Sequence, residues 1–434
     1  ELPVRRSFTI AWAMALLPAC AFFGQFALTD AVFPVLFAGW ILALHTFLRS
    51  ARTGAALVAS VLAAYAHATH TRGAVILAAH LAVLGMALLR RWGPRWVPVA
   101  AAVVTAAGVV AGRLLNDAVL HALYPGGPRD LGALWWTRMT TPQGQLRALS
   151  GAAGQIWYLG VGAWGFGAVG LAATGWALAH SRRDLRVTAG ALLATTLGIA
   201  YASAAALPDE HRVGNYAYGR YLACVAGIYA LIGLAVLSHG RPLRAVGGGI
   251  AILCCTGAWT VAYSGDRLRR HAFVGFDFPE TSFLTGDWTA LNAVRASLAA
   301  VAILAVTACV ARFREVAAAG LAALNLTALT VIGGHLAMPR EIPATPASAT
   351  AGGVAADRAL SWRIRVRQSG QIWWTTVRLF DPARERPGPG VCTVLVPASA
   401  NGGPASTWPS RPAGWRPSGS GAGWVAWRAP SCRT

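Results

Sequence analysis

The densest group of chemically active side chains lies in residues 207–222, between two long apolar runs. This stretch reads Leu-Pro-Asp-Glu-His-Arg-Val-Gly-Asn-Tyr-Ala-Tyr-Gly-Arg-Tyr-Leu. Charged groups beside hydrocarbon are costly, so the cluster indicates a site rather than a plain turn. The Arg220 guanidinium suits a phosphate, which it can bind through two parallel hydrogen bonds, and the tyrosines suit a sugar. The candidate binding residues are Arg212, Tyr216, Tyr218, Arg220 and Tyr221.

A second candidate is Asp30, which lies between the first two apolar runs. A carboxylate at the start of a helix accepts hydrogen bonds from free N–H groups and interacts favourably with the helix dipole. The same carboxylate can orient a hydroxyl acceptor or bind a metal ion. Asp30 is therefore the candidate catalytic residue, with helix capping as a compatible alternative.

A third group consists of His67, His70 and Arg72. Histidines three residues apart share one face of a helix, as metal ligands can. The sequence offers no third ligand beside them, so we favour a polar lining over a metal site. Arg72 suits a phosphate. The alternative is that Arg72 only extends from the end of a helix into the lipid headgroups.

Membrane helices must position these residues. The chain has 434 residues, of which 56% are hydrophobic and 12% charged, and its mean hydropathy is +0.50. Its apolar runs of about 17 to 23 residues are long enough to span a bilayer. The sequence therefore predicts an all-α polytopic membrane protein with about 11 transmembrane helices, within residues 1–338. We expect spans at 7–27, 31–48, 53–69, 73–89, 96–115, 152–179, 187–207, 221–237, 245–263, 291–311 and 316–338.

The net charge of +21 comes from arginine, because the chain contains no lysine. The arginines are spread over short loops, which argues against nucleic acid as a partner and favours membrane lipid and lipid-linked phosphates. They fall in every second loop, and the positive-inside rule then predicts a cytoplasmic N-terminus and an extracytoplasmic tail. We expect a multi-pass protein of the cell membrane.

Two of the expected outer loops are long, 116–150 and 264–290. Trp135 and Trp136 in the first loop are typical of a membrane interface, and the second loop holds the aromatic and acidic run 276–280. Two interpretations stay open: interfacial helices that only seal the protein, or walls of the site.

The character of the chain changes after Met338. Residues 339–357 are rich in Pro, Gly, Ala and Thr, which is typical of a linker, and residues 358–434 are predicted to form a Trp-rich, β-rich extracytoplasmic domain. Residues 362–367 alternate apolar and polar side chains, as a half-buried strand does. Further strands are expected within 371–380, 390–396 and 423–428.

The same tail holds two cysteines, Cys392 and Cys432, and an oxidising compartment outside the cell permits a disulfide between them. It also holds seven of the 18 tryptophans. We interpret these tryptophans as the core of a small domain, with stacking on sugar as the alternative.

Between about residues 7 and 340, the chain resembles the GT-C superfamily of polyprenyl-phosphate-sugar-dependent glycosyltransferases, of the protein mannosyltransferase and aminoarabinose transferase type. The similar features are short: Thr-Asp at 29–30 at the outer end of a span, His-x-Arg-Gly at 70–73, and Gly-Arg-Tyr-Leu at 219–222 opening a later span. A soluble outer tail also fits this family.

The resemblance implies an inverting transfer of a sugar from a polyprenyl-phosphate-linked donor to an acceptor at the outer face. An acid would deprotonate or orient the acceptor hydroxyl, and Arg72 and Arg220 would hold the donor phosphate. Such enzymes carry their main aspartate in a long first outer loop, and a Thr-Asp of this kind ends their third span. We therefore expect two further spans upstream of this chain, with Asp30 assisting.

The sequence leaves open a metal requirement and two other functions. A divalent metal ion is compatible with the reaction, although no metal-ligand spacing in the sequence supports one. A transporter or lipid flippase without chemistry is the alternative function, and a membrane scaffold that displays the tail is a third.

Overall fold

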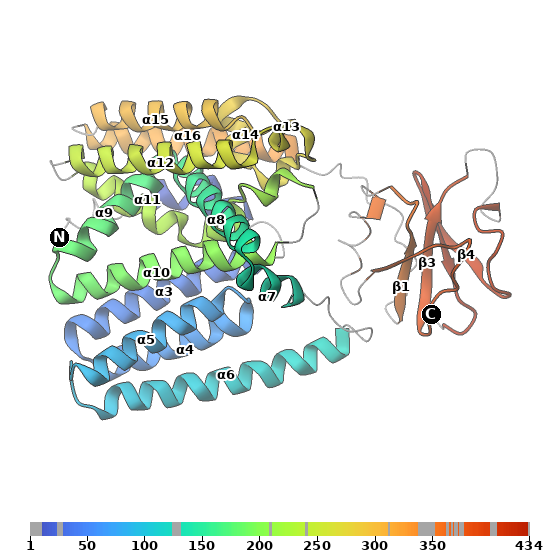
Figure 1. The fold of residues 1–434 in the computed structure, drawn as a ribbon, viewed down its shortest axis with the longest axis horizontal. Helices are drawn as coiled ribbons and strands as arrows, with labels where there is room; N and C mark the ends of the chain where they lie inside the picture. The colour runs from blue at the N-terminus through green and yellow to red at the C-terminus, as the bar shows by residue number, and fades with distance from the viewer. Residues whose placement is uncertain are drawn as a thin grey trace. The chain divides into compact units, whose positions relative to one another are not determined.

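The computed structural model describes residues 11–23, 29–123, 132–207, 211–238, 242–310, 313–336, 352–361, 364, 365, 368, 372, 377–399 and 406–432, without the side chains of 29, 30, 120–123, 132–134, 242 and 314. The chain divides into two compact units, one of residues 1–112 and 131–337 and the other of 113–130 and 338–434. The first consists of helices and the second contains a sheet (Figure 1).

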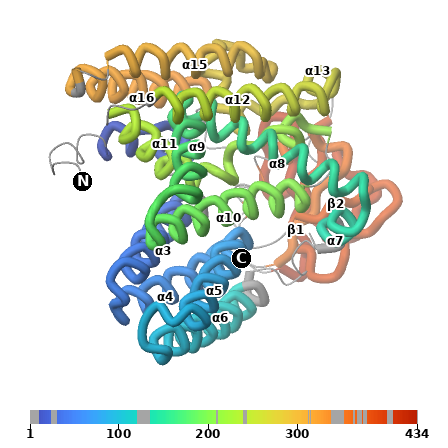
Figure 2. The backbone as a smooth tube through the Cα atoms, turned by 60° about the vertical axis from the view of Figure 1, so that its left-hand side comes forward, coloured from blue at the N-terminus to red at the C-terminus, as the bar shows by residue number. Residues whose placement is uncertain are grey.

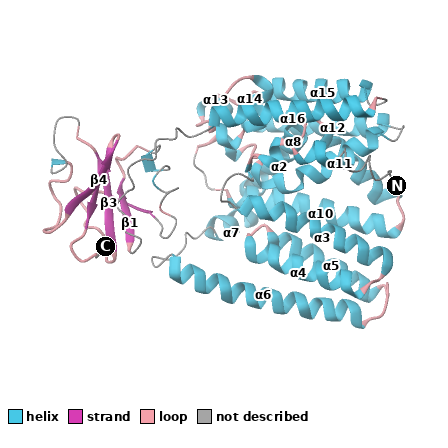
Figure 3. Cartoon of the chain, turned by 180° about the vertical axis from the view of Figure 1, so that it is seen from behind, coloured by secondary structure: helices cyan, strands magenta, loops and turns pink. Residues whose placement is uncertain are grey.

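The helices of the first unit lie side by side (Figures 1, 2 and 3). Their long members are α3 (Thr29–Ser50), α4 (Thr53–Thr69), α5 (Gly73–Leu89), α6 (Trp96–Leu123), α8 (Pro142–Gly162), α9 (Phe166–His180), α10 (Arg183–Ala206), α11 (Ala223–Ser238), α12 (Pro242–Ser264), α15 (Ala293–Val310) and α16 (Arg314–Leu336). Short helices connect them: α2 (Pro18–Ala21), α7 (Gly132–Thr140), η2 (Val213–Asn215), η3 (Arg220–Leu222), α13 (Arg267–Arg270), η4 (Gly275–Asp277) and α14 (Pro279–Thr285).

Seven of the described helices are long and apolar enough to cross a membrane. The prediction of a polytopic helical membrane protein is confirmed at this level, and its count of about eleven spans is not. Helices α4 and α5 have 17 residues each, or about 25 Å of length, against about 30 Å of hydrocarbon in a bilayer. The expected first span, 7–27, lies partly outside the described residues.

The expected span 152–179 is not one helix. Helices α8 and α9 meet at an angle of 114°, because Trp164 (φ 53°) and Gly165 (φ 85°) adopt the left-handed conformation that ends a helix. The indole N–H of Trp164 donates to Asn325 Oδ1 at 2.7 Å, and the Asn325 amide donates to the Ala13 carbonyl at 2.7 Å. This buried network holds the break in place.

Two contacts between arginine and tryptophan join turns at one end of the bundle. Arg183 at the start of α10 lies 5.2 Å from the ring of Trp92, in the turn before α6. Arg244 on α12 lies 5.9 Å from the ring of Trp176, near the end of α9. The turn before α6 therefore lies beside the start of α10, and the end of α9 lies beside the start of α12.

The second unit contains a five-stranded mixed sheet of order β2-β1-β3-β5-β4. Strand β1 is parallel to β2 and to β3, whereas β5 is antiparallel to β3 and to β4. The strands are β1 (Gly353–Asp357), β2 (Val377–Phe380), β3 (Val391–Pro397), β4 (Arg416–Gly421) and β5 (Trp424–Arg428). Strand β1 lies inside the stretch predicted to be a linker, which therefore ends earlier.

The prediction of a strand at 362–367 is wrong for the two residues of this stretch that the structure describes. Residues 364 and 365 are helical, and the Arg365 N–H donates to the Ser361 carbonyl, four residues earlier. Alternation of apolar and polar residues over so short a stretch does not exclude a helical turn, which can also bury Ile364 on one side.

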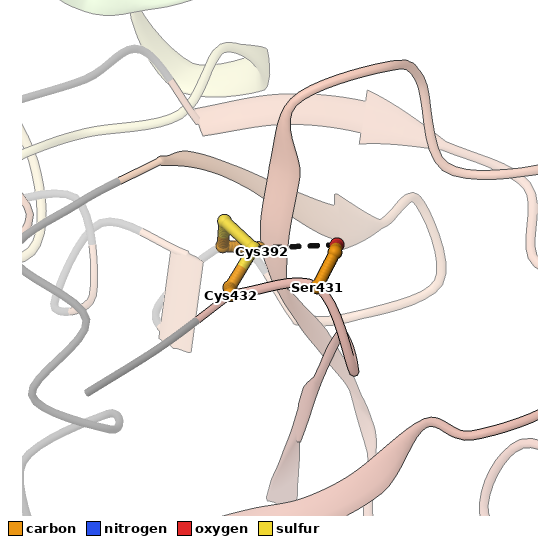
Figure 4. The surroundings of a disulfide bond; sticks show 3 residues. All are labelled: Cys392, Ser431 and Cys432. Atoms are coloured by element: carbon orange, nitrogen blue, oxygen red, sulfur yellow. Dashed lines mark hydrogen bonds between the residues drawn. A yellow bond between two sulfur atoms is a disulfide. The ribbon is translucent and has the colours of Figure 1, made fainter.

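A disulfide joins Cys392 on β3 to Cys432, with 5.6 Å between their Cα atoms (Figure 4). Trp408, Trp424 and Trp427 are buried in the domain core, and Trp415 packs against it. These four tryptophans fit the interpretation as core; the other three of the tail lie outside the described residues.

Candidate functional site

The opposite end of the bundle carries the candidate residues, and two loops pair there. The Val213 N–H donates to the Ala272 carbonyl at 3.1 Å, and the Ala272 N–H donates to the His211 carbonyl at 2.9 Å. Arg212 Nη2 lies 2.7 Å from Oδ2 of Asp277, a buried carboxylate on η4. Because this ion pair joins the two loops, Arg212 holds the site together.

Tyr216 belongs to the same contact between the loops. Its hydroxyl lies 3.5 Å from Nδ1 of His271, and the guanidinium carbon of Arg267 lies 5.1 Å from the centre of its ring. Tyr216 is itself buried. Tyr216 thus contacts the loop between α12 and η4, and its ring centre also lies 6.3 Å from that of Tyr263 on α12.

Arg72 lies in the turn between α4 and α5 and is buried, with 5% of its surface exposed. Its guanidinium carbon lies 5.1 Å from the ring centres of both Phe33 and Tyr221. Nη1 donates to the Tyr221 carbonyl at 2.9 Å, and Nδ1 of His70 accepts from the Arg72 backbone N–H at 3.1 Å and from Nε at 3.4 Å. This arrangement fixes the position of Tyr221 against α3 and α4.

Tyr221 continues the network to Arg220. Its ring centre lies 4.7 Å from that of Tyr218, and the Arg220 side chain donates a hydrogen bond to the Tyr218 hydroxyl oxygen. Burial raises the pKa of Tyr218, so the phenol stays protonated at neutral pH. The Arg220 guanidinium carbon lies 5.9 Å from the ring centre of Phe23.

A narrow pocket lies beside Arg220. It encloses about 240 Å³ of empty space, part of it open to the surroundings. Gly219, which precedes Arg220, and Leu222, two residues after it, line the pocket together with Phe23. Its other lining residues are Ala19, Tyr158, Leu159, Gly162, Ala223, Ala226 and Glu280.

Glu280 on α14 is the one acid in this lining, and it is 1% exposed. The Tyr158 hydroxyl on α8 donates to Oε2 of Glu280 at 2.6 Å. Burial raises the pKa of Glu280 to about 7, and hydrogen bonds from Tyr158 and from its own backbone N–H oppose this rise in part. Glu280 therefore changes charge near neutral pH.

Asp30 lies in the first turn of α3, and its side chain is outside the described residues. Phe33, whose ring contacts Arg72, follows three residues later, and positions three apart share one face of a helix. The backbone of Asp30 is therefore close to the Arg72 network.

Five predicted residues form one connected network: His70, Arg72, Tyr218, Arg220 and Tyr221. Arg212 and Tyr216 lie at the same end of the bundle and bind the neighbouring loop instead. The sequence interpretation missed Glu280 and Tyr158. The run 276–280 could have indicated Glu280, because acidic and aromatic residues are interspersed there. A loop that only connects two helices needs neither type of residue.

Within the described part of the chain, no three His, Cys, Asp or Glu side chains come together to hold a metal ion. His67 and His70 are therefore not joined there by the third ligand that a metal site needs.

Comparisons of the chain with protein-family models, with curated proteins and with solved structures found no match.

Proposed function

We propose that the chain is a membrane glycosyltransferase that moves a sugar from a polyprenyl-phosphate donor to an acceptor at the outer face of the membrane. The observation that supports this most is the connected network from Arg72 to Arg220 beside the Glu280 pocket. It combines a cation, phenol hydroxyls and a carboxyl at the apolar boundary where a lipid-linked phosphate would lie. The resemblance to the GT-C superfamily supports the same function.

Each residue of the network has a distinct role in this proposal. Arg220 holds the donor phosphate and stabilises the charge left on it when the bond to the sugar breaks. Tyr218 and Tyr221 line the sugar. Arg72 is a positioning residue, because its guanidinium lies between two rings and donates to the Tyr221 carbonyl. Asp30 stays the candidate that orients the acceptor.

The second candidate function is a transporter or lipid flippase. The sharp break between α8 and α9 favours it, because secondary transporters build substrate sites from discontinuous helices. Gly162, at the end of α8, lines the pocket. Both functions involve a lipid-linked sugar bound beside Arg220, and only the transferase breaks the bond between the sugar and the phosphate.

Binding of the lipid phosphate is tested on the purified protein in lipid nanodiscs. The proposal expects undecaprenyl phosphate to raise the unfolding temperature and undecaprenol, which lacks the phosphate, to leave it unchanged. Arg220→Lys keeps the charge and loses the planar pair of donors, so it should weaken the stabilisation. Arg269→Lys on α13, whose side chain is 86% exposed, is the matched control. Equal stabilisation by both lipids would contradict the phosphate site.

Chemistry separates the two candidate functions. The proposal expects the full-length protein, supplied with a cell-envelope extract as the source of acceptor hydroxyls, to release undecaprenyl phosphate from at least one member of a panel of undecaprenyl-phosphate hexoses and pentoses. A transporter would instead move the intact lipid between the leaflets of a vesicle, without releasing the sugar.

A further inference from the structure

Glu280 has few interactions that would explain it as a structural residue. It lies in the wall of a pocket, 1% exposed, and its hydrogen-bond donors are Tyr158 and its own backbone N–H. None of the described arginines or histidines forms an ion pair with it. The neighbouring acid Asp277 differs, because it is paired with Arg212 at 2.7 Å. A buried carboxyl without a cationic partner is costly when ionised, and such groups are common at functional sites.

The pocket is too small for a whole sugar. Its space of about 240 Å³ counts every gap between the lining atoms as well as the part open to the surroundings, so the room left for a ligand is much smaller. A single hydroxyl group fits better. The pocket also adjoins the proposed phosphate site, since Phe23 both lines it and lies 5.9 Å from the Arg220 guanidinium carbon.

We infer that Glu280 is the group that takes the proton from the acceptor hydroxyl, with Tyr158 holding its carboxylate in position; this rests on the function proposed above. The acceptor oxygen forms a bond to the anomeric carbon of the sugar while the bond from that carbon to the phosphate oxygen breaks. The proton of the hydroxyl moves to Glu280, and the electron pair of the broken bond stays on the polyprenyl phosphate beside Arg220. No oxidant, reductant or further reactant is needed.

The surroundings of Glu280 suit a proton acceptor. The pKa of about 7 leaves a large fraction ionised at neutral pH and still makes the carboxylate a stronger base than an exposed one. Helix α14 packs against α2, α8, α15, α16 and η4. Among the described residues, the titratable groups that act on Glu280 or respond to its charge are Tyr158 on α8 and Cys20 on α2.

The test compares Glu280→Gln with the wild-type chain in nanodiscs. Gln has nearly the same shape and can still accept from Tyr158, so stabilisation by undecaprenyl phosphate should persist. Release of undecaprenyl phosphate from the sugar-lipid panel should fall by about 10²- to 10⁴-fold, the usual contribution of a general base. Asp266→Asn, an outer-end acid with a 60% exposed side chain, is the control that should keep wild-type turnover.

The pH profile provides a second readout, which a structural role would not move. Wild-type turnover should rise with pH, with a midpoint near 7. Tyr158→Phe removes a hydrogen bond that favours the ionised carboxylate, so the midpoint should shift upward while turnover at high pH persists. This variant also tests the inference if Glu280→Gln does not fold.

The outcomes separate the inference from the proposed function. If Glu280→Gln turns over within twofold of wild type, or if the Tyr158→Phe profile does not move, the inference is wrong and the transferase stands. If the full-length protein is not stabilised by undecaprenyl phosphate and, with the acceptor supplied, releases none from any sugar-lipid, the proposed function is wrong and the inference fails with it.

Discussion

Arg72 donates a hydrogen bond of 2.9 Å to the backbone carbonyl of Tyr221, although the two residues are 149 positions apart in sequence. The same guanidinium lies 5.1 Å from the centre of the Tyr221 ring. The turn between α4 and α5 is thereby tied to the start of α11. A buried arginine that donates to a main-chain carbonyl fixes backbone position, and it thus determines where Tyr221 and its neighbour Arg220 lie.

Replacing Arg72 by Met should destabilise the protein. The substitution removes a hydrogen bond from a charged group and two cation–π contacts, and we expect a loss of about 2 to 4 kcal/mol in the free energy of unfolding. Thermal unfolding in detergent measures it. Arg269→Met removes an exposed guanidinium and should change stability by no more than about 0.5 kcal/mol. Equal effects of the two substitutions would show that Arg72 is no structural tie.

Glu280 should make stability depend on pH. An unfolded Glu loses its proton near pH 4.3, whereas folded Glu280 keeps it up to about pH 7 because burial raises its pKa. This contribution to stability is fully present below about pH 4.3 and is lost as pH rises through about 7, with a total on the order of 3 to 4 kcal/mol.

The measurement is the unfolding temperature at several pH values. Glu280→Gln cannot ionise, so its unfolding temperature should fall less between pH 5 and pH 8 than that of the wild-type chain. Asp266→Asn should keep the wild-type profile, because the Asp266 side chain is 60% exposed. Parallel profiles for Glu280→Gln and the wild type would mean that Glu280 is already ionised at pH 5.

The disulfide should stabilise the sheet of the second unit. Cys392 and Cys432 are separated by 40 residues, and closing a loop of that length contributes about 4 kcal/mol in the chain-entropy model. Replacing both cysteines by Ser should speed amide hydrogen exchange in β3 and β5, as measured by mass spectrometry, and leave α10 unchanged. Cys309→Ser on α15 is the control. Unchanged exchange in β3 would show that the sheet does not need this link.

The tail should be accessible from outside the cell and the N-terminus should not. The alternation of arginine-rich and arginine-poor loops predicts this orientation. Protease added to spheroplasts should release a fragment that begins after α16, while an epitope at the N-terminus stays protected until the membrane is permeabilised. Protection of the tail together with cleavage of the N-terminal epitope would establish the inverse orientation.

Several features followed from the sequence by itself. A long apolar run must form a helix in a bilayer, because every backbone polar group there needs an internal partner, so composition and run length were enough to predict the helical class. The pairing of Cys392 with Cys432 was predictable because no other cysteine lies in the tail. The group of candidates in 207–222 was visible because polar residues beside hydrocarbon are rare.

Only the tertiary structure decided which helix ends meet and what each candidate touches. Arg212 and Arg220 look alike in the sequence, yet one is paired with Asp277 and the other lies beside the pocket. The packing of this loop is equally specific: a Cβ on Gly154 of α8 would lie 1.8 Å from the Tyr216 carbonyl oxygen, so only glycine fits there. A one-dimensional pattern reports how apolar each position is, whereas long-range contacts depend on shapes that become complementary only when distant segments meet.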